Sequence, residues 1–271
     1  MNLILILTAP IWAGLIYGFE RKLRARLQAR KGPPLMQPFY DLAKLADKRV
    51  LIANPLHAML GLAHFASAWL ALSILLSGGD LLVAIFFHLF STALLVMAGF
   101  SVNSAFSRIG SIRQLMMIVA AEPIFILCAF GMQQNSGSFS DLWSASDMLE
   151  HTWLLLIALI IVLPIVLKKS PFDAAEAHQE IVGGAEIEYS GIFYEAVYTA
   201  KWLDMIFCYA FIALFAGGNI AIGLLLTVGV FFLINIIDNS TARIKASDTV
   251  KIAYMVAFPL AIANLFIMEV F

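Results

Sequence analysis

Long apolar segments recur along the chain and are separated by short polar connections. A membrane-spanning helix needs about 20 predominantly apolar residues. The segments that approach or meet this length are Leu3–Phe19, Leu56–Leu76, Leu81–Ser101, Gln114–Gly131, Thr152–Leu167, Ile192–Ala216, Ile220–Ile237 and Val250–Val270. The pattern therefore predicts an all-α, polytopic integral membrane protein with about eight transmembrane helices, in which residues 1–271 form a single transmembrane domain.

Composition supports lipid as the solvent of this chain. Hydrophobic residues make up 62% of the sequence and charged residues 13%, whereas soluble domains have roughly 45–50% and roughly 25%. These proportions leave no room for a separate soluble domain. The segment that begins Met1-Asn2-Leu3 lacks a basic region, so we expect a retained first span and not a removed signal peptide. Cys128 and Cys208 lie inside apolar segments, where we expect them to serve as packing residues.

Basic residues are distributed unevenly over the connections, and this asymmetry predicts the orientation. Residues 20–54 hold nine of the 17 lysines and arginines, and seven more lie at 108–113, 168–169 and 243–251. The connections 77–80, 132–151 and 217–219 hold none. Because cytoplasmic loops of membrane proteins are enriched in lysine and arginine, the asymmetry predicts an even number of spans in the cytoplasmic membrane, with both termini on the non-cytoplasmic side.

The first long connection, residues 20–55, is a basic loop with two possible roles. Gly32-Pro33-Pro34 ends any helix, and apolar residues then recur every three or four positions through Leu45, which predicts an amphipathic helix at the membrane surface. Anionic headgroups would attract each basic residue by about 1 kcal/mol. Alternatively, Arg26, Arg30 and Lys31 form a cytoplasmic docking surface for a partner protein, which suits such a long ordered loop better.

Charged residues inside the predicted spans are costly and are by default candidates for function. Glu122 lies in the fourth span, where the following Pro123 is expected to kink the helix. Glu195, Lys201 and Asp204 lie in the sixth span, and Lys201 and Asp204 are three residues apart and able to pair. These groups either form neutralised pairs that hold helices together or belong to a proton path, and we favour the proton path.

The connection over residues 168–191 is rich in carboxylates although it lies on the basic face. If this segment is helical, Asp173, Glu176 and Glu180 share one side of the helix. Carboxylates so close together raise one another's pKa toward neutrality, and His178 is one more group that can titrate in this pH range. Glu188 follows in the same loop. One alternative is a solvated acidic loop. The other is a metal site, but the spacing of Glu176, His178 and Glu180 does not put all three on one helical face and so disfavours a metal.

Several of these motifs, taken in order, resemble one family of membrane subunits. The chain is similar to the subunit that adjoins the peripheral arm of respiratory complex I and of the energy-converting (group 4) membrane-bound [NiFe] hydrogenases. The similarity extends over nearly the whole chain. It is carried by residues 20–45, by Arg113 with Glu122-Pro123, by Ser170-Pro171-Phe172-Asp173 through Glu188-Tyr189-Ser190-Gly191, and by Ala242-Arg243-Ile244-Lys245.

Two departures favour the hydrogenase branch, of the ferredoxin-linked or formate-hydrogenlyase kind. Complex I subunits place several extra residues between the Gly-Pro and Gln-Pro motifs, where they shape a quinone chamber, but residues 32–38 are contracted here. Lys201 stands where the quinone enzymes usually have an acid. The contraction and Lys201 both argue against a quinone site.

The resemblance implies a subunit without its own catalytic centre in an ion-translocating oxidoreductase. It would dock a hydrogenase arm and couple electron transfer from ferredoxin or formate to translocation of H⁺ or Na⁺. The [NiFe] centre and iron–sulfur clusters would lie in partner subunits, namely the large and small hydrogenase subunits and an iron–sulfur subunit, and an antiporter-like membrane subunit would adjoin. This chain would bind no cofactor, metal or nucleic acid.

The same resemblance assigns roles to individual residues. Docking falls to Arg26, Arg30, Lys31 and Arg113. Coupling and ion translocation fall to Asp173, Glu176, Glu180, Glu188, Glu122, Glu195, Lys201 and Asp204.

Three other functions make different predictions. A quinone-site subunit of a complex I-type enzyme would need the longer loop. A secondary transporter would show inverted repeats, and we find no convincing repeat. A passive membrane anchor would need basic loops but no acids inside its spans, which Glu122, Glu195 and Asp204 contradict.

Overall fold

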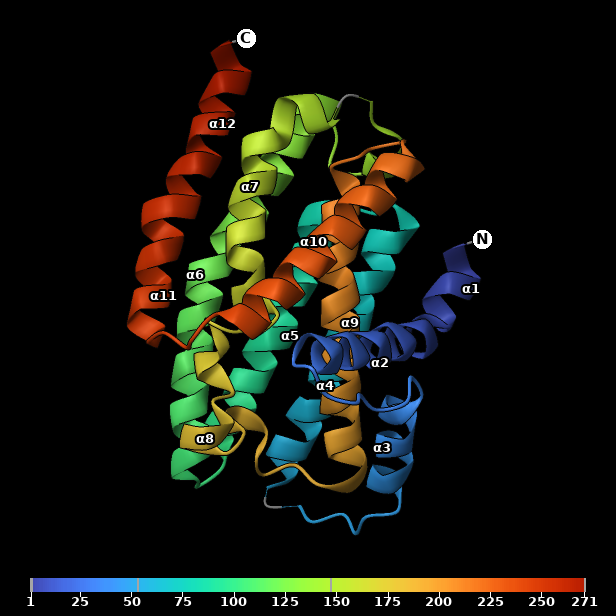
Figure 1. Cartoon of the computed structure of the whole chain (residues 1–271), viewed down its shortest axis with the longest axis vertical. Helices are drawn as coiled ribbons and strands as arrows, with labels where there is room; N and C mark the ends of the chain where they lie inside the picture. The colour runs from blue at the N-terminus through green and yellow to red at the C-terminus, as the bar shows by residue number, and fades with distance from the viewer. Residues whose placement is uncertain (1, 53, 147, 271) are drawn as a thin grey trace.

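The computed structural model describes residues 2–52, 54–146 and 148–270, and most of this part of the chain is helical (Figure 1). The longer helices are α2 (Ala9–Leu27), α3 (Gln37–Ala46), α4 (Pro55–Ser77), α5 (Leu81–Ser101), α6 (Ala105–Ser136), α7 (Met148–Val166), α9 (Gly191–Leu214), α10 (Ile220–Ser240) and α12 (Phe258–Val270). The shorter segments are α1 (Asn2–Leu7), η1 (Leu142–Ser144), η2 (Asp173–Ala175), α8 (His178–Ile181), η3 (Gly184–Glu186), α11 (Ala246–Ile252) and the π-helical η4 (Ala253–Ala257).

Among the described residues, seven helices are long and apolar enough to cross a membrane: α4, α5, α6, α7, α9, α10 and the continuous stretch Ala246–Glu269. This finding confirms the prediction of an all-α polytopic membrane protein. Short polar side chains start several of the helices. Asn54, Asp80, Ser104 and Asn219 each accept a hydrogen bond from an amide in the first turn of the helix that follows.

The predicted first span, Leu3–Phe19, is not one helix in the structure. It is divided between α1 and α2 at Thr8, because Pro10 lacks an N–H group and clashes with a preceding helical turn. Helix α2 then continues past Phe19 to Leu27 and carries the first basic residues of the predicted loop. In Figure 1 it crosses the upright helices obliquely, and it packs on α3, α9 and α10.

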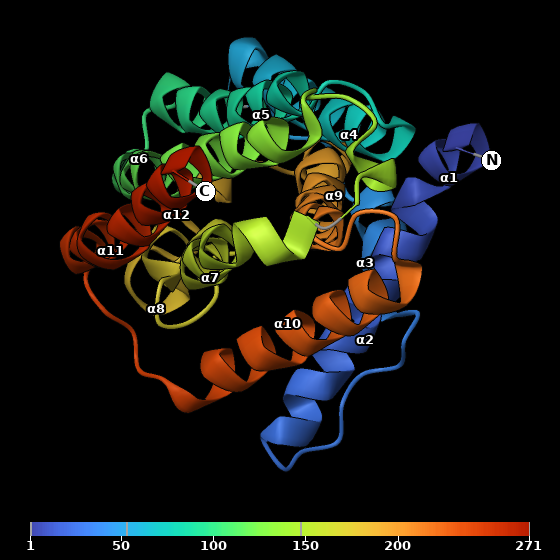
Figure 2. The ribbon, with the colours of Figure 1, turned by 90° about the horizontal axis from the view of Figure 1, so that it is seen from above.

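Helix α9 lies at the centre of the bundle and is the most buried of the seven spans. Viewed from above, it is surrounded by α2, α3, α4, α7 and α10 (Figure 2). On the side of α9 opposite α2 and α10, α4 packs on α5 and α5 packs on α6. Helix α6 in turn packs on α7 and α12. Buried small residues such as Ala68, Ala71 and Ala84 let α4 and α5 approach closely, as is common for helices in membranes.

Helix α6 remains helical through Pro123, where we expected a kink. The interruption lies instead in α7, where Thr152 has non-helical torsions (φ −117°, ψ 19°). Asn264 of α12 compensates for the break. Its Oδ1 accepts hydrogen bonds from the amides of Leu154 (3.0 Å) and Leu155 (3.3 Å), and its Nδ2 donates to the carbonyl of His151 (2.7 Å).

The connections rich in basic residues lie in the lower half of Figure 1, with the one between α10 and α11 near mid-height, and the connections without basic residues lie in the upper half. The fold thus brings together the charges from which we predicted the orientation. Which side of the membrane each terminus occupies stays a prediction.

The basic and acidic connections are both held against the bundle. The segment predicted as an amphipathic helix forms helix α3, and Arg21 of α2 binds Asp41 of α3 at 2.7 Å. That α3 lies at the membrane surface stays a prediction. The acidic connection packs its η3 segment on α6 at Gly110, where a Cβ atom would collide with the backbone of Gly184 and Ala185. This close approach of two backbones places the carboxylates of the connection over α6 and α9.

Candidate functional site

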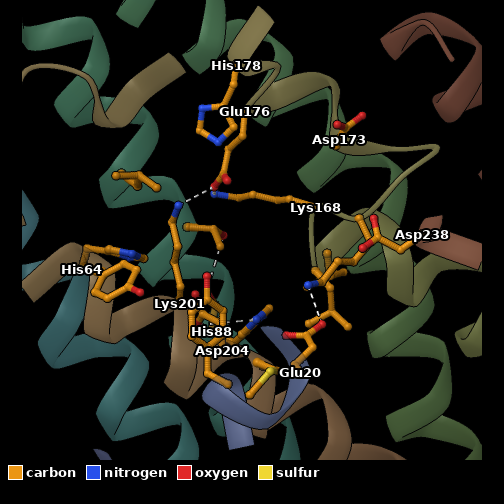
Figure 3. A pocket seen from close by; sticks show the side chains of 18 of the residues that line it. Glu20, His64, His88, Lys168, Asp173, Glu176, His178, Lys201, Asp204 and Asp238 are labelled. Carbon is orange, nitrogen blue, oxygen red and sulfur yellow. Dashed lines mark hydrogen bonds and ion pairs between the residues drawn. The ribbon is translucent and has the colours of Figure 1, made fainter. Parts of the chain in front are cut away.

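A cavity of about 330 Å³ lies between α2, α4, α5, α9 and the connection that follows α7 (Figure 3). Its walls are unusually rich in ionisable side chains for a site inside a membrane domain. They include Glu20, Arg24, His64, His88, Lys168, Lys169, Asp173, Glu176, His178, Lys201, Asp204 and Asp238.

Two lysines and two glutamates form a cluster where the acidic connection covers this cavity; Glu186 is buried, and Lys168, Glu176 and Lys201 are partly buried. Lys201 Nζ lies 3.0 Å from Glu176 and 2.7 Å from Glu186, and Lys168 Nζ lies 2.7 Å from Glu176 and 3.5 Å from Glu186. The predicted pair of Lys201 with Asp204 is therefore wrong. The acidic connection folds back over α9 and offers Lys201 two carboxylates that are distant in sequence.

The pKa values of the two glutamates of this cluster are shifted in opposite directions. Burial by itself would raise the pKa of Glu176, but the ammonium groups of Lys168 and Lys201 bring it well below its usual value. Burial raises the pKa of Glu186; Lys201 opposes this increase, whereas the charge of Glu176 adds to it. A carboxyl pair separated in this way keeps one member ionised while the other accepts or releases a proton.

The outer carboxylates of the acidic connection each bind arginine. Asp173 forms a two-pronged ion pair with Arg243, with both contacts at 2.6 Å, and Glu180 lies 2.7 Å from Arg113 and 3.6 Å from Arg243. Hydrogen bonding from Arg113 lowers the pKa of Glu180.

Two expectations about this segment are therefore wrong. Asp173, Glu176 and Glu180 do not share one helical face, because the connection turns at Ala177 between η2 and α8. Nor do Glu176 and Glu180 have a pKa raised toward neutrality, since the nearest charges to both are cations, which lower the pKa of each. The raised pKa belongs to Glu186, which sequence reasoning did not assign to the site.

Deeper in the bundle, His88 of α5 lies between two of the acids in the spans, Glu122 and Asp204. Its Nδ1 is 3.2 Å from Glu122 Oε1 on α6, and its Nε2 is 4.0 Å from Asp204 Oδ1 on α9. Sequence reasoning missed His88, although a histidine inside an apolar span was itself a signal. The distance of 34 residues between His88 and Glu122 hid their proximity.

A second row of charges closes the side of the cavity toward α2 and α10. Lys169 lies 2.5 Å from Glu20, and Arg24 lies 2.9 Å from Asp238. Sequence reasoning placed Glu20 and Arg24 in an exposed loop, and only the continuation of α2 beyond Phe19 brings them to the cavity.

Three other predicted residues lie outside this network. Glu195 is half-buried on α9, and neither it nor Glu188 forms an ion pair within the described residues. His178 bonds the carbonyl of Val182 through Nδ1 (2.9 Å). Within the same part of the chain, no group of three His, Cys, Asp or Glu side chains is arranged to hold a metal ion.

The four predicted docking residues divide into two sets. Arg26, Arg30 and Lys31 are exposed at the end of α2 and just beyond it. Arg113, in contrast, is engaged within the chain, because it binds Glu180 and also donates a hydrogen bond to the carbonyl of Ala174 (3.1 Å). The structure thus places Arg113 with the acidic connection.

Comparison with known sequences identifies the family. The profile described as NADH dehydrogenase matches residues 1–269. The chain belongs to the NADH dehydrogenase family. Membership confirms the resemblance found in the sequence, and together with the seven apolar helices it makes the chain a multi-pass protein of the cell membrane.

Relatives in this NADH dehydrogenase family include hydrogenase and quinone-reductase subunits. Hydrogenase-4 component C of Escherichia coli is 26% identical, with coverage of 89% of this chain and 85% of the relative. Formate hydrogenlyase subunit 4 of the same organism is also 26% identical (93% and 92%). A subunit of the NADH-quinone oxidoreductase of Aquifex aeolicus is 27% identical (93% and 89%).

The fold also matches a solved structure. A chain of the membrane-bound sulfane sulfur reductase, an archaeal respiratory membrane complex, superposes with a TM-score of 0.88 at 21% identity and with 98% of both chains covered. The names of these proteins describe each as a component of a larger complex.

Proposed function

We propose that this chain is the membrane subunit of an energy-converting [NiFe] hydrogenase complex, in which it docks the hydrogenase arm and couples electron transfer to translocation of H⁺ or Na⁺. The observation that supports this proposal is a series of ionisable groups that leads from the basic end of the bundle into the membrane domain. Such groups are costly inside a membrane and are typical of ion and proton pathways.

The series has three parts that lie next to one another. At the surface, Arg113 and Arg243 bind the carboxylates of Asp173 and Glu180. Below them is the cluster of Glu176 and Glu186 with its two lysines. Lys201 of that cluster is one helical turn from Asp204 on α9, and His88 connects Asp204 to Glu122.

The cluster is suited to couple a charge change in a docked arm to proton uptake. Glu176 and Glu186 share two ammonium groups, so movement of either lysine changes the proton affinity of both carboxylates. A reduced centre in the arm that draws the cations of the acidic connection outward would thereby favour protonation of Glu186. Oxidation would reverse the change and release the proton into the series.

The exposed Arg26, Arg30 and Lys31 form the surface that receives the arm. Complementary charge steers association and sets orientation, and the end of α2, where these residues lie, is, like the acidic connection, in the lower half of Figure 1. The arm would consist of the large and small hydrogenase subunits and an iron–sulfur subunit, which hold the [NiFe] centre and clusters. An antiporter-like membrane subunit would receive the charge relayed through Glu122.

A quinone site of the complex I type is the second candidate, because a relative of comparable identity is an NADH-quinone oxidoreductase subunit. The cavity also has the volume of a small-molecule site. Such sites are lined mainly by apolar side chains, whereas ion pairs line this cavity. The charged lining favours a pathway for ions over a chamber for an apolar quinone.

The test is purification of the intact complex in mild detergent, followed by metal analysis and assays with reduced ferredoxin and with formate. Nickel, iron and donor-driven hydrogen evolution are expected. Iron without nickel, together with quinone reduction, would contradict the hydrogenase assignment and favour the second candidate.

Coupling is tested with Glu186→Gln in inverted membrane vesicles. This variant is expected to evolve hydrogen but to lose most donor-driven ion uptake, because glutamine cannot bind the proton. Asp248→Asn is the matched control, since the Asp248 side chain is 46% exposed and, within the described residues, its ion pair is a local one with Lys251. Normal ion uptake by Glu186→Gln would show that the cluster does not couple the two processes.

A further inference from the structure

His88 occupies a position that neither packing nor helix association explains. Its side chain is completely buried, yet it faces a carboxylate on each side, one from α6 and one from α9. The ring stacks on Phe207 with a centroid distance of 4.5 Å and an interplanar angle of 8°, and Phe125 lies 5.8 Å away. This stacking fixes the plane of the imidazole, so that Nδ1 points to Glu122 and Nε2 to Asp204.

The contacts of His88 are close but poorly aligned. Within the described residues, neither ring nitrogen makes a hydrogen bond of good geometry, and the same holds for Glu122 Oε2 and Asp204 Oδ1. Buried polar atoms in proteins are nearly always hydrogen-bonded. Four such atoms at one place call for an explanation beyond packing, and a functional role is one.

A second buried histidine on the same cavity provides the contrast. His64 of α4 has its Nδ1 2.9 Å from the carbonyl oxygen and 2.7 Å from the hydroxyl oxygen of Ser91. Its partners are neutral groups of the neighbouring helix, and they hold the ring in place. His64 therefore links α4 to α5, whereas His88 lies between two carboxyl groups.

We propose that His88 carries protons between Asp204 and Glu122, so that the inner pathway of this chain conducts H⁺, whichever ion an adjoining subunit moves. The proposal rests on the function proposed above. An imidazole accepts a proton at one nitrogen and releases a proton from the other, and it therefore joins two acids that do not touch. Hard cations such as Ca²⁺ and Mg²⁺ are bound by oxygen ligands, and a central imidazole interrupts such a path.

The transfer conserves protons at each step. Protonated Asp204 gives its proton to Nε2 of neutral His88, which leaves a carboxylate and an imidazolium. The imidazolium then releases the proton on Nδ1 to ionised Glu122, which leaves neutral His88 with its proton on Nε2. Transfer of the Nε2 proton to a water molecule in the cavity, with return of a proton from water to Nδ1, restores the starting tautomer. The 4.0 Å between Nε2 and Asp204 closes by a small rotation of the carboxylate.

His88→Gln in the intact complex tests this role, with His64→Gln as the matched control. Both positions are buried, line the same cavity and lie in neighbouring helices. Inverted vesicles report donor-driven ion uptake and hydrogen evolution separately. His88→Gln is expected to slow uptake by about 100-fold, the lower end of what a positioned acid–base group contributes, while hydrogen evolution continues. His64→Gln is expected to retain coupled uptake.

A chemical rescue separates proton transfer from a structural role. His88→Ala opens space on the cavity, and added imidazole is expected to restore uptake in this variant but not in Glu122→Gln. Normal uptake in His88→Gln, or failure of imidazole to restore His88→Ala in assembled complex, would overturn the proposal for His88. Absence of ion uptake in the wild-type complex would instead refute the proposed function itself.

Discussion

Lys201→Met removes one of the two ammonium groups that neutralise Glu176 and Glu186. The two contacts of Lys201 measure 3.0 and 2.7 Å, and Lys168 remains 2.7 and 3.5 Å from the same carboxylates. At an effective dielectric constant near 20, each lost contact represents a gross attraction of about 6 kcal/mol. Breaking a buried ion pair by truncation of one partner typically costs about 3–5 kcal/mol net. We expect the lower end of this range, because Lys168 stays in place.

The loss of stability in Lys201→Met is expected to depend on pH, and the direction of this dependence follows from Glu186. Burial already raises the pKa of Glu186, which Lys201 opposes, so removal of Lys201 raises that pKa further. A glutamate whose pKa in the folded protein exceeds the value of about 4.3 in the unfolded chain binds more protons when folded. Stability then falls by about 1.4 kcal/mol per pH unit as the pH rises between the two pKa values. Lys201→Met is therefore expected to be less stable at pH 8 than at pH 5.5.

The assay is thermal unfolding of the purified complex in mild detergent at both pH values. A lower Tm than wild type is expected for Lys201→Met, with the larger deficit at pH 8, and Glu186→Gln added to this variant is expected to recover most of it. Lys251→Met is the control, since Lys251 is 63% exposed in its pair with Asp248 and such surface pairs contribute about 0–1 kcal/mol. An unchanged Tm for Lys201→Met, or no recovery with Glu186→Gln, would refute the reasoning.

Two further predictions concern orientation and packing. Cysteines introduced at the exposed Lys48 and Ser138 are expected to react with a membrane-impermeant maleimide from opposite sides of sealed vesicles. The two native cysteines are buried and are not expected to react. Labelling of both introduced cysteines from one side would contradict the predicted orientation. Asn264→Ala leaves the amides of Leu154 and Leu155 without their acceptor, and each unsatisfied buried donor costs about 1–3 kcal/mol. A drop in Tm is therefore expected, and an unchanged Tm would show that the break in α7 is satisfied in another way.

The hydrophobic pattern predicted most of the fold because it is a local property of the chain. The segment Leu81–Ser101 was predicted with the bounds that α5 has in the structure, and α4, α9 and α10 differ from prediction by a few residues at their ends. Apolar length decides whether a segment lies in lipid, and neighbouring helices do not change that. The first segment was an exception, because Pro10 divides it and the charged part of α2 continues the helix. The fourth, predicted as Gln114–Gly131, was another, because α6 extends from Ala105 to Ser136.

The contacts of the site could not be predicted in the same way, because they join residues far apart in sequence. Glu122, Glu176, Lys201 and Asp204 were found in advance, because a charge in or beside an apolar span is conspicuous. Their partners were not found. Lys201 has a long side chain that reaches either Asp204 on its own helix or the carboxylates of the acidic connection, and nothing within α9 distinguishes the two.

The sequence by itself determined the solvent of this protein, its family, the approximate spans, the end of the bundle at which the basic residues gather, and which acids are candidates for ion transport. Only the tertiary structure decided which charges meet, because helix packing and the close approach at Gly110 set the position of the acidic connection. It assigned the raised pKa to Glu186 and placed His88 between Glu122 and Asp204. Hydropathy acts on each residue separately, whereas the proton affinity of a buried group depends on the charges that the fold places around it.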